Sequence, residues 1–381
     1  MSDRPYDVAI VGGGLVGLAT ALALLERAPA LAVALCEKEP RLAAHQSSHN
    51  SGVIHAGIYY APGSAKARLC VEGARLLTAF CDRHGIRYER RGKVIVATRP
   101  EELPRLERLY ERGLANGVPG LARLDAARLR EIEPHAAGLA AIHSPATAVV
   151  DFAEVAAAIG RELERRGATI LTGAPVTRVR RTAEGYRLGT PRGEVAARLL
   201  INCAGLYADR VARLCGVRPP VAIVPFRGEY YRLRPERREL VRGLIYPVPD
   251  PALPFLGVHF TRGVTGEVEA GPNAVLALAR EGYSYRDVRP AEVAAMLAYR
   301  GFWRMAARYW RAGLAELYRS LVKRAFARAL ARLVPEVREA DLLPGGAGVR
   351  AQAVAPDGRL VDDFRIVETD RAIHVLNAPS P

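Results

Sequence analysis

Residues 6–39 read YDVAIVGGGLVGLATALALLERAPALAVALCEKE, and this stretch decides the fold. The apolar segment Asp7–Val11 is typical of a β-strand and leads directly into GGGLVG, a G-x-G-x-x-G loop. We predict a helix from Leu15 to Arg27 and a second strand from Leu31 to Cys36, which delivers Glu37 roughly 20 residues after the last glycine. This is the order of a βαβ unit that binds a dinucleotide, with the acid accepting hydrogen bonds from ribose hydroxyls.

Each residue type in this unit has a physical reason. Gly12 permits a tight turn, Gly14 lets the backbone approach a pyrophosphate, and Gly17 lets helix and strand pack closely. The free N–H groups at the start of the helix, at Leu15 and Val16, favour phosphate there. The alternative, a glycine-rich turn in an ordinary α/β protein, leaves the acidic strand end unexplained.

Length and composition restrict the class of protein. The chain has 381 residues, of which 50% are hydrophobic, so it can bury a large core, and we expect two interleaved domains. There is no run of about 18 uncharged apolar residues, and the first strand begins almost at the N-terminus, so we expect neither a transmembrane helix nor a signal peptide. The five cysteines lack C-x-x-C spacing, which is typical of reduced thiols in a cytoplasmic protein.

The chain is strongly basic. Its formal net charge is +15, which suits anionic substrates, an anionic membrane surface or nucleic acid and does not choose among them. A GC-rich genome would also produce many arginines without any binding role.

A polar segment with three histidines follows the first βαβ unit. No cysteine or carboxylate joins His45, His49 and His55, so we do not predict a metal site. The small hydroxyl and amide side chains between them are better suited to packing against a planar cofactor. The string HQSSHNSGVIHAGIYYAPGSAKARLC (45–70) resembles the flavin-contacting loop of D-amino-acid-oxidase-like, FAD-dependent oxidoreductases. Within this superfamily it is similar to the L-2-hydroxyglutarate oxidase/dehydrogenase family.

The resemblance implies an α/β fold with two interleaved domains. One is an FAD-binding, Rossmann-like domain of the glutathione-reductase type, which we assign to residues 4–60, 145–220 and 341–381. The other is a substrate domain with an antiparallel sheet and helices, which we assign to residues 61–144 and 221–340.

Several segments supply the predicted FAD site. The string LLINCAGLYAD (199–209) resembles the strand–Ala-Gly–helix motif whose backbone passes close to FAD, and a strand end near Val176 touches the adenine in the superfamily. The residues assigned to the cofactor are Gly12, Gly14, Leu15, Val16, Gly17, Glu37, Lys38, His45, Ser47, Ser48, Asn50, Ser51, Gly52, Val176, Ala204, Gly205, Asn377, Ala378, Pro379 and Ser380.

Periodicity and turn residues predict the elements between these motifs. The predicted helices are 66–84, 101–116, 125–130 and 152–166, the last with Asp151 as its N-cap. The predicted strands are 93–98, 169–171, 176–181, 186–190, 194–197, 199–202 and 373–376, with a hairpin edge over 140–150 and a strand-rich substrate sheet over 221–273.

The substrate sheet carries the candidate pocket. The strings PFRGEYYRL (225–233) and YPVPDPALPFLGVHFTR (246–262) resemble the hydroxyglutarate branch, and their polar side chains Arg227, Tyr246, His259 and Arg262 are candidates for the pocket. Each of them has a surface or structural role as its alternative.

The resemblance implies oxidation of L-2-hydroxyglutarate to 2-oxoglutarate, with hydride transfer to flavin N5 and electrons passed to quinone or oxygen. His55, amid apolar neighbours, is our candidate for the base that takes the hydroxyl proton, and a core histidine is the alternative. Arg350 is the first candidate to grip one carboxylate, and Arg227 and Lys66 are candidates for the other.

The stretch from Tyr285 to Leu333 is helical, basic and aromatic in pattern. It contains both tryptophans, Trp303 and Trp310, beside several arginines. One interpretation is a helical pair packed on the substrate domain, and another is an interfacial helix that binds anionic lipid on the inner face of the cell membrane, near a quinone pool. We expect no nucleic acid, because no DNA- or RNA-binding motif accompanies the charge.

The C-terminal strand returns to the nucleotide domain, and in the family it continues into a closing helix. Here the chain stops at Pro381, so we expect weaker retention of FAD. Three alternatives stay open: a glycerol-3-phosphate-type dehydrogenase, an amine oxidase on the same fold, and a catalytically idle, basic membrane-associated homologue.

Overall fold

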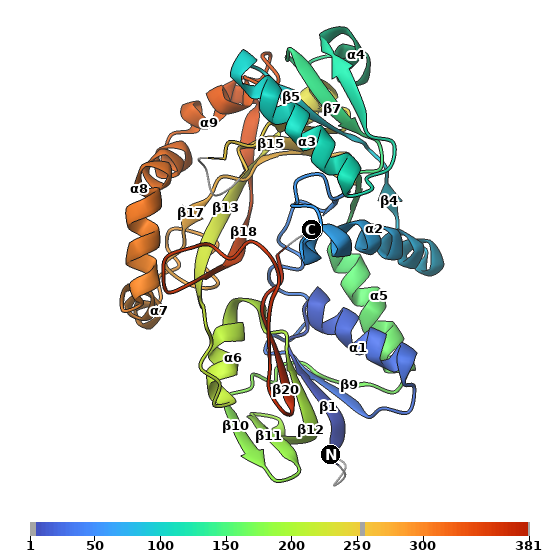
Figure 1. Cartoon of the computed structure of the whole chain (residues 1–381), viewed down its shortest axis with the longest axis vertical. Helices are drawn as coiled ribbons and strands as arrows, with labels where there is room; N and C mark the ends of the chain where they lie inside the picture. Colours follow the sequence, from blue (N-terminus) through green and yellow to red (C-terminus); the bar gives the residue numbers. More distant parts are fainter. Residues whose placement is uncertain (1–4, 252–255, 380–381) are drawn as a thin grey trace.

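Two sheets lie one above the other along the long axis of the molecule, with helices around them (Figure 1). The structure is a computed structural model, which describes residues 5–251 and 256–379. Ser380 and residues 252–255 of the predicted substrate sheet lie outside this description.

The lower sheet is built around β1 (Tyr6–Val11). The strand pairs in parallel with β2 (Val33–Cys36) on one side and with β12 (Gly193–Asn202) on the other. The sheet is completed by β9 (Thr169–Leu171), β10 (Arg178–Thr182), β11 (Gly185–Thr190), β19 (Arg365–Glu368) and β20 (Ala372–Asn377). Parallel pairing brings the carboxyl ends of β1, β2 and β12 to the same edge, which faces the second sheet.

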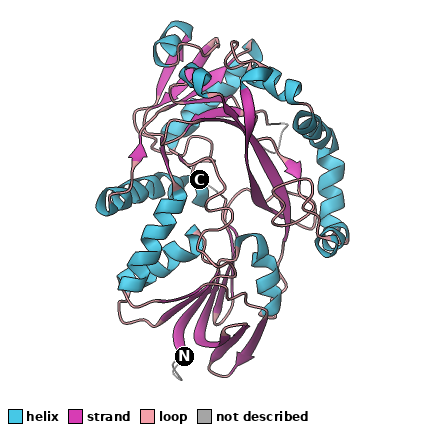
Figure 2. Ribbon diagram, turned by 180° about the vertical axis from the view of Figure 1, so that it is seen from behind, coloured by secondary structure: helices cyan, strands magenta, loops and turns pink. Residues whose placement is uncertain are grey.

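Helices cover both faces of the lower sheet (Figure 2). On one face α1 (Leu15–Arg27) and α5 (Phe152–Arg165) pack together over apolar strand residues. On the other face lies α6 (Ala208–Leu214), which follows the 3₁₀ turn η2 (Gly205–Tyr207). Asp151 is the N-cap of α5, as predicted, and its carboxylate accepts a hydrogen bond of 2.7 Å from the N–H of Ala153.

The upper sheet is larger and almost entirely antiparallel. Its strands are β17 (Val275–Leu276), β13 (Ala222–Leu233), β16 (Val268–Gly271), β15 (His259–Arg262), β14 (Leu244–Pro247), β5 (Lys93–Ala97), β7 (Ala140–Ser144) and β6 (Ala122–Asp125), in this order, and β18 (Leu342–Val354) pairs with β13 along nearly its whole length. β18 falls in a segment, 341–381, that we predicted for the FAD-binding domain, so the chain stays in the upper sheet up to Val354 before it returns to the lower sheet at β19.

The remaining elements surround the upper sheet. The helices are α3 (Leu103–Ala115), α4 (Ala126–Ile132), α7 (Pro290–Leu297), α8 (Arg300–Leu321) and α9 (Lys323–Leu330), with the 3₁₀ turns η1 (Pro100–Glu102), η3 (Pro235–Leu240) and η4 (Glu339–Asp341). A three-stranded sheet of β3 (Val53–Ile54), β8 (Ala148–Val150) and β4 (Tyr88–Glu89), together with α2 (Ala65–His84), lies between the two large sheets. No helix in the described part of the chain is long and apolar enough to cross a bilayer.

Most predicted elements are present within one or two residues of their predicted ends, but three predictions are wrong. Residues 140–150 do not form a hairpin, because β7 pairs with β5 and β8 pairs with β3. The two predicted strands 194–197 and 199–202 are one strand, β12, whose first half pairs with β11 and whose second half pairs with β20. The basic stretch 285–333 forms three helices rather than a pair.

Candidate functional site

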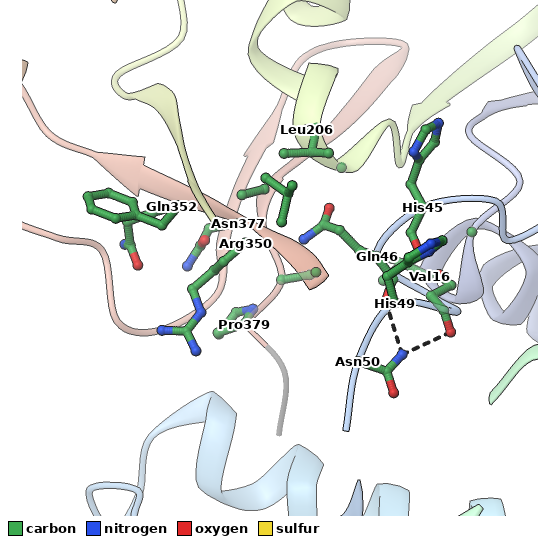
Figure 3. A pocket seen from close by; sticks show the side chains of 18 of the residues that line it. Val16, His45, Gln46, His49, Asn50, Leu206, Arg350, Gln352, Asn377 and Pro379 are labelled. Atoms are coloured by element: carbon green, nitrogen blue, oxygen red, sulfur yellow. Dashed lines mark hydrogen bonds between the residues drawn. The ribbon is translucent and has the colours of Figure 1, made fainter. Parts of the chain in front are cut away.

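A cavity of about 1640 Å³ opens where the two sheets face each other (Figure 3). Its lining comes from the carboxyl ends of the parallel strands, from the segment that leads into β3, and from β13, β14, β15, β18 and β20. Ligand cavities usually measure about 300–1000 Å³. This cavity therefore has room for a ligand of dinucleotide size together with a small second molecule.

The glycine loop admits no side chain at two of its predicted positions. Gly12 has φ +112°, and a Cβ atom there would overlap the backbone carbonyl of Cys203. A Cβ atom on Gly17 would overlap the carbonyl oxygen of Gly12, so this glycine allows the helix to pack and does not itself line the cavity. Gly14 lines the cavity, and a Cβ atom there would meet only the Oγ atom of Ser47, at 3.0 Å.

Glu37 ends β2 in a buried position and holds the loop in shape. Its carboxylate accepts hydrogen bonds from the N–H of Gly13 at 2.7 Å and from the N–H of Glu39 at 2.8 Å. The side chain also lines the cavity beside the glycine loop. This carboxylate therefore fixes the shape of the loop from a place on the cavity wall.

The segment from His45 to Gly52 divides into lining and supporting residues. Ser47 accepts a hydrogen bond of 2.9 Å from the N–H of Leu15, and Asn50 donates two hydrogen bonds of 3.0 Å to backbone carbonyls of the same turn (Figure 3). Ser48 instead donates to the carbonyl of Ala43 at 2.6 Å, and a Cβ atom on Gly52 would come within 2.8 Å of a carbonyl of β8. Ser48 and Gly52 therefore have structural roles here and are not among the lining residues.

The other predicted cofactor residues of the described chain lie on the cavity wall. These are Leu15, Val16, Lys38, His45, Ser51, Val176, Ala204, Gly205, Asn377, Ala378 and Pro379. Asn377 is held in place because its amide donates to the carbonyl of Asp363 at 2.8 Å.

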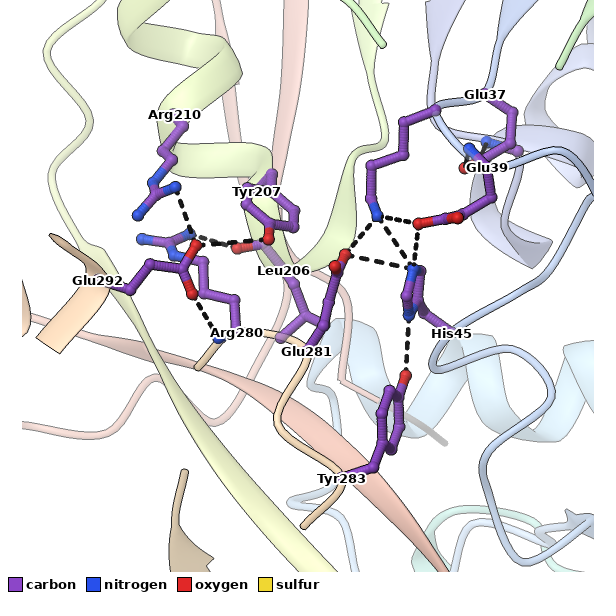
Figure 4. Close-up of polar contacts among 12 residues, drawn as sticks. Glu37, Glu39, His45, Leu206, Tyr207, Arg210, Arg280, Glu281, Tyr283 and Glu292 are labelled. Carbon is purple, nitrogen blue, oxygen red and sulfur yellow. Dashed lines mark hydrogen bonds and ion pairs between the residues drawn. The ribbon is translucent and has the colours of Figure 1, made fainter. Parts of the chain in front are cut away.

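His45 belongs to a polar cluster that joins the segment after β2 to the segment after β17 (Figure 4). Its Nδ1 atom lies 2.9 Å from the Tyr283 hydroxyl, and its Nε2 atom lies 2.8 Å from Glu39 and 3.2 Å from Glu281. Three of these groups could surround a metal ion, but the ammonium of Lys38 already pairs with both carboxylates. Hydrogen bonds from Lys38 and His45 lower the pKa of Glu39 to about 2. Sequence reasoning missed Glu281 and Tyr283, which are distant in sequence and belong to no motif.

A second group of side chains lines the cavity beneath the upper sheet, around His55. The Nδ1 atom of His55 is buried and has no hydrogen-bond partner among the described residues. Burial, and then the nearby charge of Lys93, hold the pKa of His55 well below its usual 6.5. The imidazole is therefore uncharged at neutral pH and has a nitrogen available to accept a proton.

Tyr246 and His259 stack beside this histidine, with ring centroids 3.8 Å apart. His259 Nδ1 lies 2.9 Å from the carbonyl oxygen of Gly257, and so donates to it, which leaves Nε2 as the unprotonated nitrogen. Burial lowers the pKa of His259 to about 4. Tyr59 lines the same wall, and its buried hydroxyl has no partner in the described chain.

Two cationic side chains face the cavity near His55. Arg350 extends from β18 into it, beside Pro379 (Figure 3), and burial lowers the pKa of its guanidinium. Lys66, at the start of α2, reaches Asp362 with its Nζ atom at 3.0 Å and lies 4.7 Å from the centroid of the Tyr60 ring.

Two arginines that we predicted for the pocket donate hydrogen bonds to acceptors within the protein. Arg227 donates from Nε and Nη2 to Glu229 at 3.0 and 2.9 Å, and from Nη1 to the carbonyl of Ser284 at 2.9 Å, so its charge is already neutralised. Arg262 donates to two backbone carbonyls beside η3 and does not line the cavity, so this prediction is wrong.

The cavity fits FAD by its shape and its donor set. A crowded glycine turn at the start of α1, a buried acid at the end of β2 and apolar lining near β12 and β20 are the surfaces that a dinucleotide requires. The space beside His55, Arg350 and Lys66 is left for a small anion.

Comparisons with known proteins agree with this geometry. The family model described as "DAO: FAD dependent oxidoreductase" matches residues 7–380. A protein of Indibacter alkaliphilus named L-2-hydroxyglutarate dehydrogenase is 50% identical over 99% of this chain and 94% of its own length. Proteins of the same name from Escherichia coli K12 and, with the addition "mitochondrial", from Homo sapiens are 47% and 44% identical, over 99% and 100% of this chain and 89% and 86% of theirs.

Solved structures show the same fold. FAD-bound L-α-glycerophosphate oxidase from Mycoplasma pneumoniae superposes with a TM-score of 0.78 at 22% identity, over 98% of this chain and 89% of that one. Glycine oxidase from Geobacillus kaustophilus superposes with a TM-score of 0.71 at 23% identity, over 97% and 88%. At this identity the likeness concerns the fold alone.

Proposed function

The chain belongs to the DAO family of FAD-dependent oxidoreductases, and we propose that it oxidises L-2-hydroxyglutarate to 2-oxoglutarate. The observation that carries the proposal is one cavity in which the predicted FAD-binding loop meets an uncharged histidine and two cationic side chains. Relatives named for this activity, which match nearly the whole chain, support the choice of substrate.

His55 is the proposed base. Bound FAD would supply the hydride acceptor for oxidation of a CH–OH group. The hydroxyl proton has to leave as the carbonyl forms, and the unpartnered Nδ1 atom of His55 can take it. Because burial keeps the ring uncharged, the base is ready at neutral pH without prior loss of a proton.

Arg350 and Lys66 are the proposed anchors for the two substrate carboxylates. Arg350 can form a two-pronged hydrogen bond with one carboxylate from its place on the cavity wall. Lys66 can exchange its ion pair with the exposed carboxylate of Asp362 for the second carboxylate at little cost. Arg227 is not retained as an anchor, because Glu229 already neutralises it.

An anaerobic titration tests this function. Purified protein saturated with FAD is mixed with L-2-hydroxyglutarate, its D-enantiomer, glycerol 3-phosphate, glycine or L-proline, and flavin absorbance is recorded. We expect bleaching by L-2-hydroxyglutarate alone. Faster bleaching by glycerol 3-phosphate or by an amine would transfer the assignment to one of the alternatives on this fold.

We further propose that α8 holds the protein on the inner face of the cell membrane, where a quinone would accept the electrons. The side chains Trp303, Trp310, Leu314, Leu317 and Leu321 are between 39% and 65% exposed. Their spacing of seven, four, three and four residues puts them on one face of the helix. Both overall views place α8 at the edge of the molecule (Figures 1 and 2).

Exposed arginines at 300, 304, 308 and 311 lie along one side of this apolar stripe. An apolar face with a cationic flank is typical of helices that lie in the interface of an anionic bilayer. Vesicle flotation tests the proposal: wild-type protein should float with vesicles containing anionic phosphatidylglycerol and not with neutral ones, and Trp310→Glu should weaken flotation. Equal flotation with both kinds of vesicle would exclude an electrostatic membrane surface.

A further inference from the structure

Lys93 opens β5 and is a charged residue in an otherwise apolar strand. Its side chain is 1% exposed, and its Nζ atom lies 4.6 Å from the centroid of the Tyr59 ring and 5.0 Å from that of Tyr246. Within residues 5–251 and 256–379, no carboxylate lies at ion-pair distance from this ammonium. The two rings provide a favourable but partial substitute for water.

This position works against the stability of the fold. Removing an ammonium from water is costly, and an apolar side chain of similar length would avoid the cost. Burial accordingly lowers the pKa of Lys93 from 10.5 to about 7. Between these two values the unfolded chain binds the proton more tightly than the folded one, so the lysine destabilises the fold increasingly as the pH falls from about 10.5 towards 7. Groups held at such a cost are concentrated in functional sites.

The rings that cover Lys93 belong to the cavity wall. Tyr59 and Tyr246 line the cavity, and His55 and His259 stand on the same wall. Lys93 is the strongest charge acting on His55 after burial itself, and it acts on His259 as well. The titratable groups around the two residues are Tyr59, Lys66, Cys70, Tyr246 and His259.

We propose that Lys93 is a positioning residue of this site, whose charge, from beneath the Tyr59–Tyr246 wall, keeps His55 in its proton-accepting form and favours entry of a dianion. The proposal rests on the proposed oxidation of a 2-hydroxy dicarboxylate. Lys93 is not among the residues that line the cavity, so it acts through its electric field and not by contact. The interior screens this field far less than water does. A bound dianion in turn stabilises the protonated lysine, so binding takes up a proton near neutral pH.

The first test compares Lys93→Met with Arg99→Met, which removes an exposed positive charge just beyond the same strand. Holoenzymes are reduced by L-2-hydroxyglutarate in a stopped-flow instrument between pH 5 and 9. In Lys93→Met, the acid limb, which is the pH range in which the flavin reduction rate falls on acidification, should move up by roughly 0.5–1.5 pH units. The apparent affinity for L-2-hydroxyglutarate should fall about 10-fold. Thermal stability should stay the same or rise. Arg99→Met should match the wild type.

A loss of thermal stability with an unmoved acid limb would overturn the proposal, because a merely structural lysine would behave in that way. The second test needs no turnover. Titration calorimetry of glutarate binding to the wild-type holoenzyme, in buffers of different ionisation enthalpy, should report uptake of on the order of half a proton, centred near pH 7 to 8. No uptake would overturn the proposal.

The two tests separate this proposal from the proposed function. If glutarate binding takes up a proton in the wild type and not in Lys93→Met, the role of Lys93 stands even where L-2-hydroxyglutarate fails to bleach the flavin. If Lys93→Met takes up as much proton as the wild type, a histidine is the responsible group and Lys93 is not.

Discussion

Replacing His55 by glutamine is expected to slow flavin reduction about 10²- to 10⁴-fold and to leave substrate affinity almost unchanged. The free-energy equivalent is roughly 2.7–5.4 kcal/mol, at 1.36 kcal/mol for each factor of ten. Glutamine keeps a polar side chain in the wall, but its amide cannot accept and hold a proton. The prediction depends on the buried Nδ1 atom, which has no partner in the described chain and which the uncharged ring leaves free to act.

The pH dependence provides a second measure of the same residue. Burial and Lys93 lower the pKa of His55 well below 6.5, so the base is charged, and inactive, only in acid. The limiting rate of anaerobic stopped-flow reduction should therefore fall only at a pH well below 6.5, the usual pKa of histidine. A wild-type rate in His55→Gln, or an acid limb at or above pH 6.5 in the wild type, would refute the assignment. If His55→Gln keeps the wild-type rate, His259, whose pKa is about 4, is the next candidate.

Three further changes test other parts of the structure. Gly14→Val should fold, because a Cβ atom at this position meets only the Oγ atom of Ser47. The valine methyl groups should block the FAD phosphates, so a fluorescence titration should show loss of FAD binding. An unchanged titration would contradict the predicted loop. Arg350→Ala should weaken substrate binding by about 2–5 kcal/mol and leave the limiting rate nearly unchanged. Arg350→Lys should recover only part of the lost binding free energy. Asp209→Asn should lower the free energy of unfolding in urea by about 3–5 kcal/mol, because Asp209 is the buried partner of Arg280, at 2.5 and 2.9 Å; an unchanged midpoint would show that Arg280 finds other acceptors.

The nucleotide-binding half of the fold was predictable because its signals are local. In β1, α1 and β2, the glycine turn, the apolar helix and the acidic strand end each determine the structure within a few residues of themselves. Strand partners are not determined locally. β7 and β8 are short and almost wholly buried, and a turn separates them, so the sequence favours a hairpin, yet their partners β5 and β3 lie more than 40 residues away in sequence.

The same distinction applies to the site. Arg227 and Glu229 are two residues apart on one strand, and thus on one face, so their pairing was visible in the sequence and was overlooked. Lys93 also left a signal, a charge at the start of an otherwise apolar strand. Glu281 and Tyr283 left none, because only the folded chain brings them to His45.

The chain has a net charge of +15, and its positive charges at the surface and at the cavity should respond differently to salt. The arginines at 300, 304, 308 and 311 of α8 are exposed, and at 0.15 M salt their attraction for a membrane is screened over about 8 Å. The charges of Arg350 and Lys93 face a cavity or lie beneath its wall, away from the outer surface of the molecule. Raising salt from about 0.02 to 0.5 M should therefore release the protein from anionic vesicles and change the substrate affinity much less. A parallel loss of both would mean that the substrate is held by the outer surface charge, and the anchoring assigned to the cavity would be wrong.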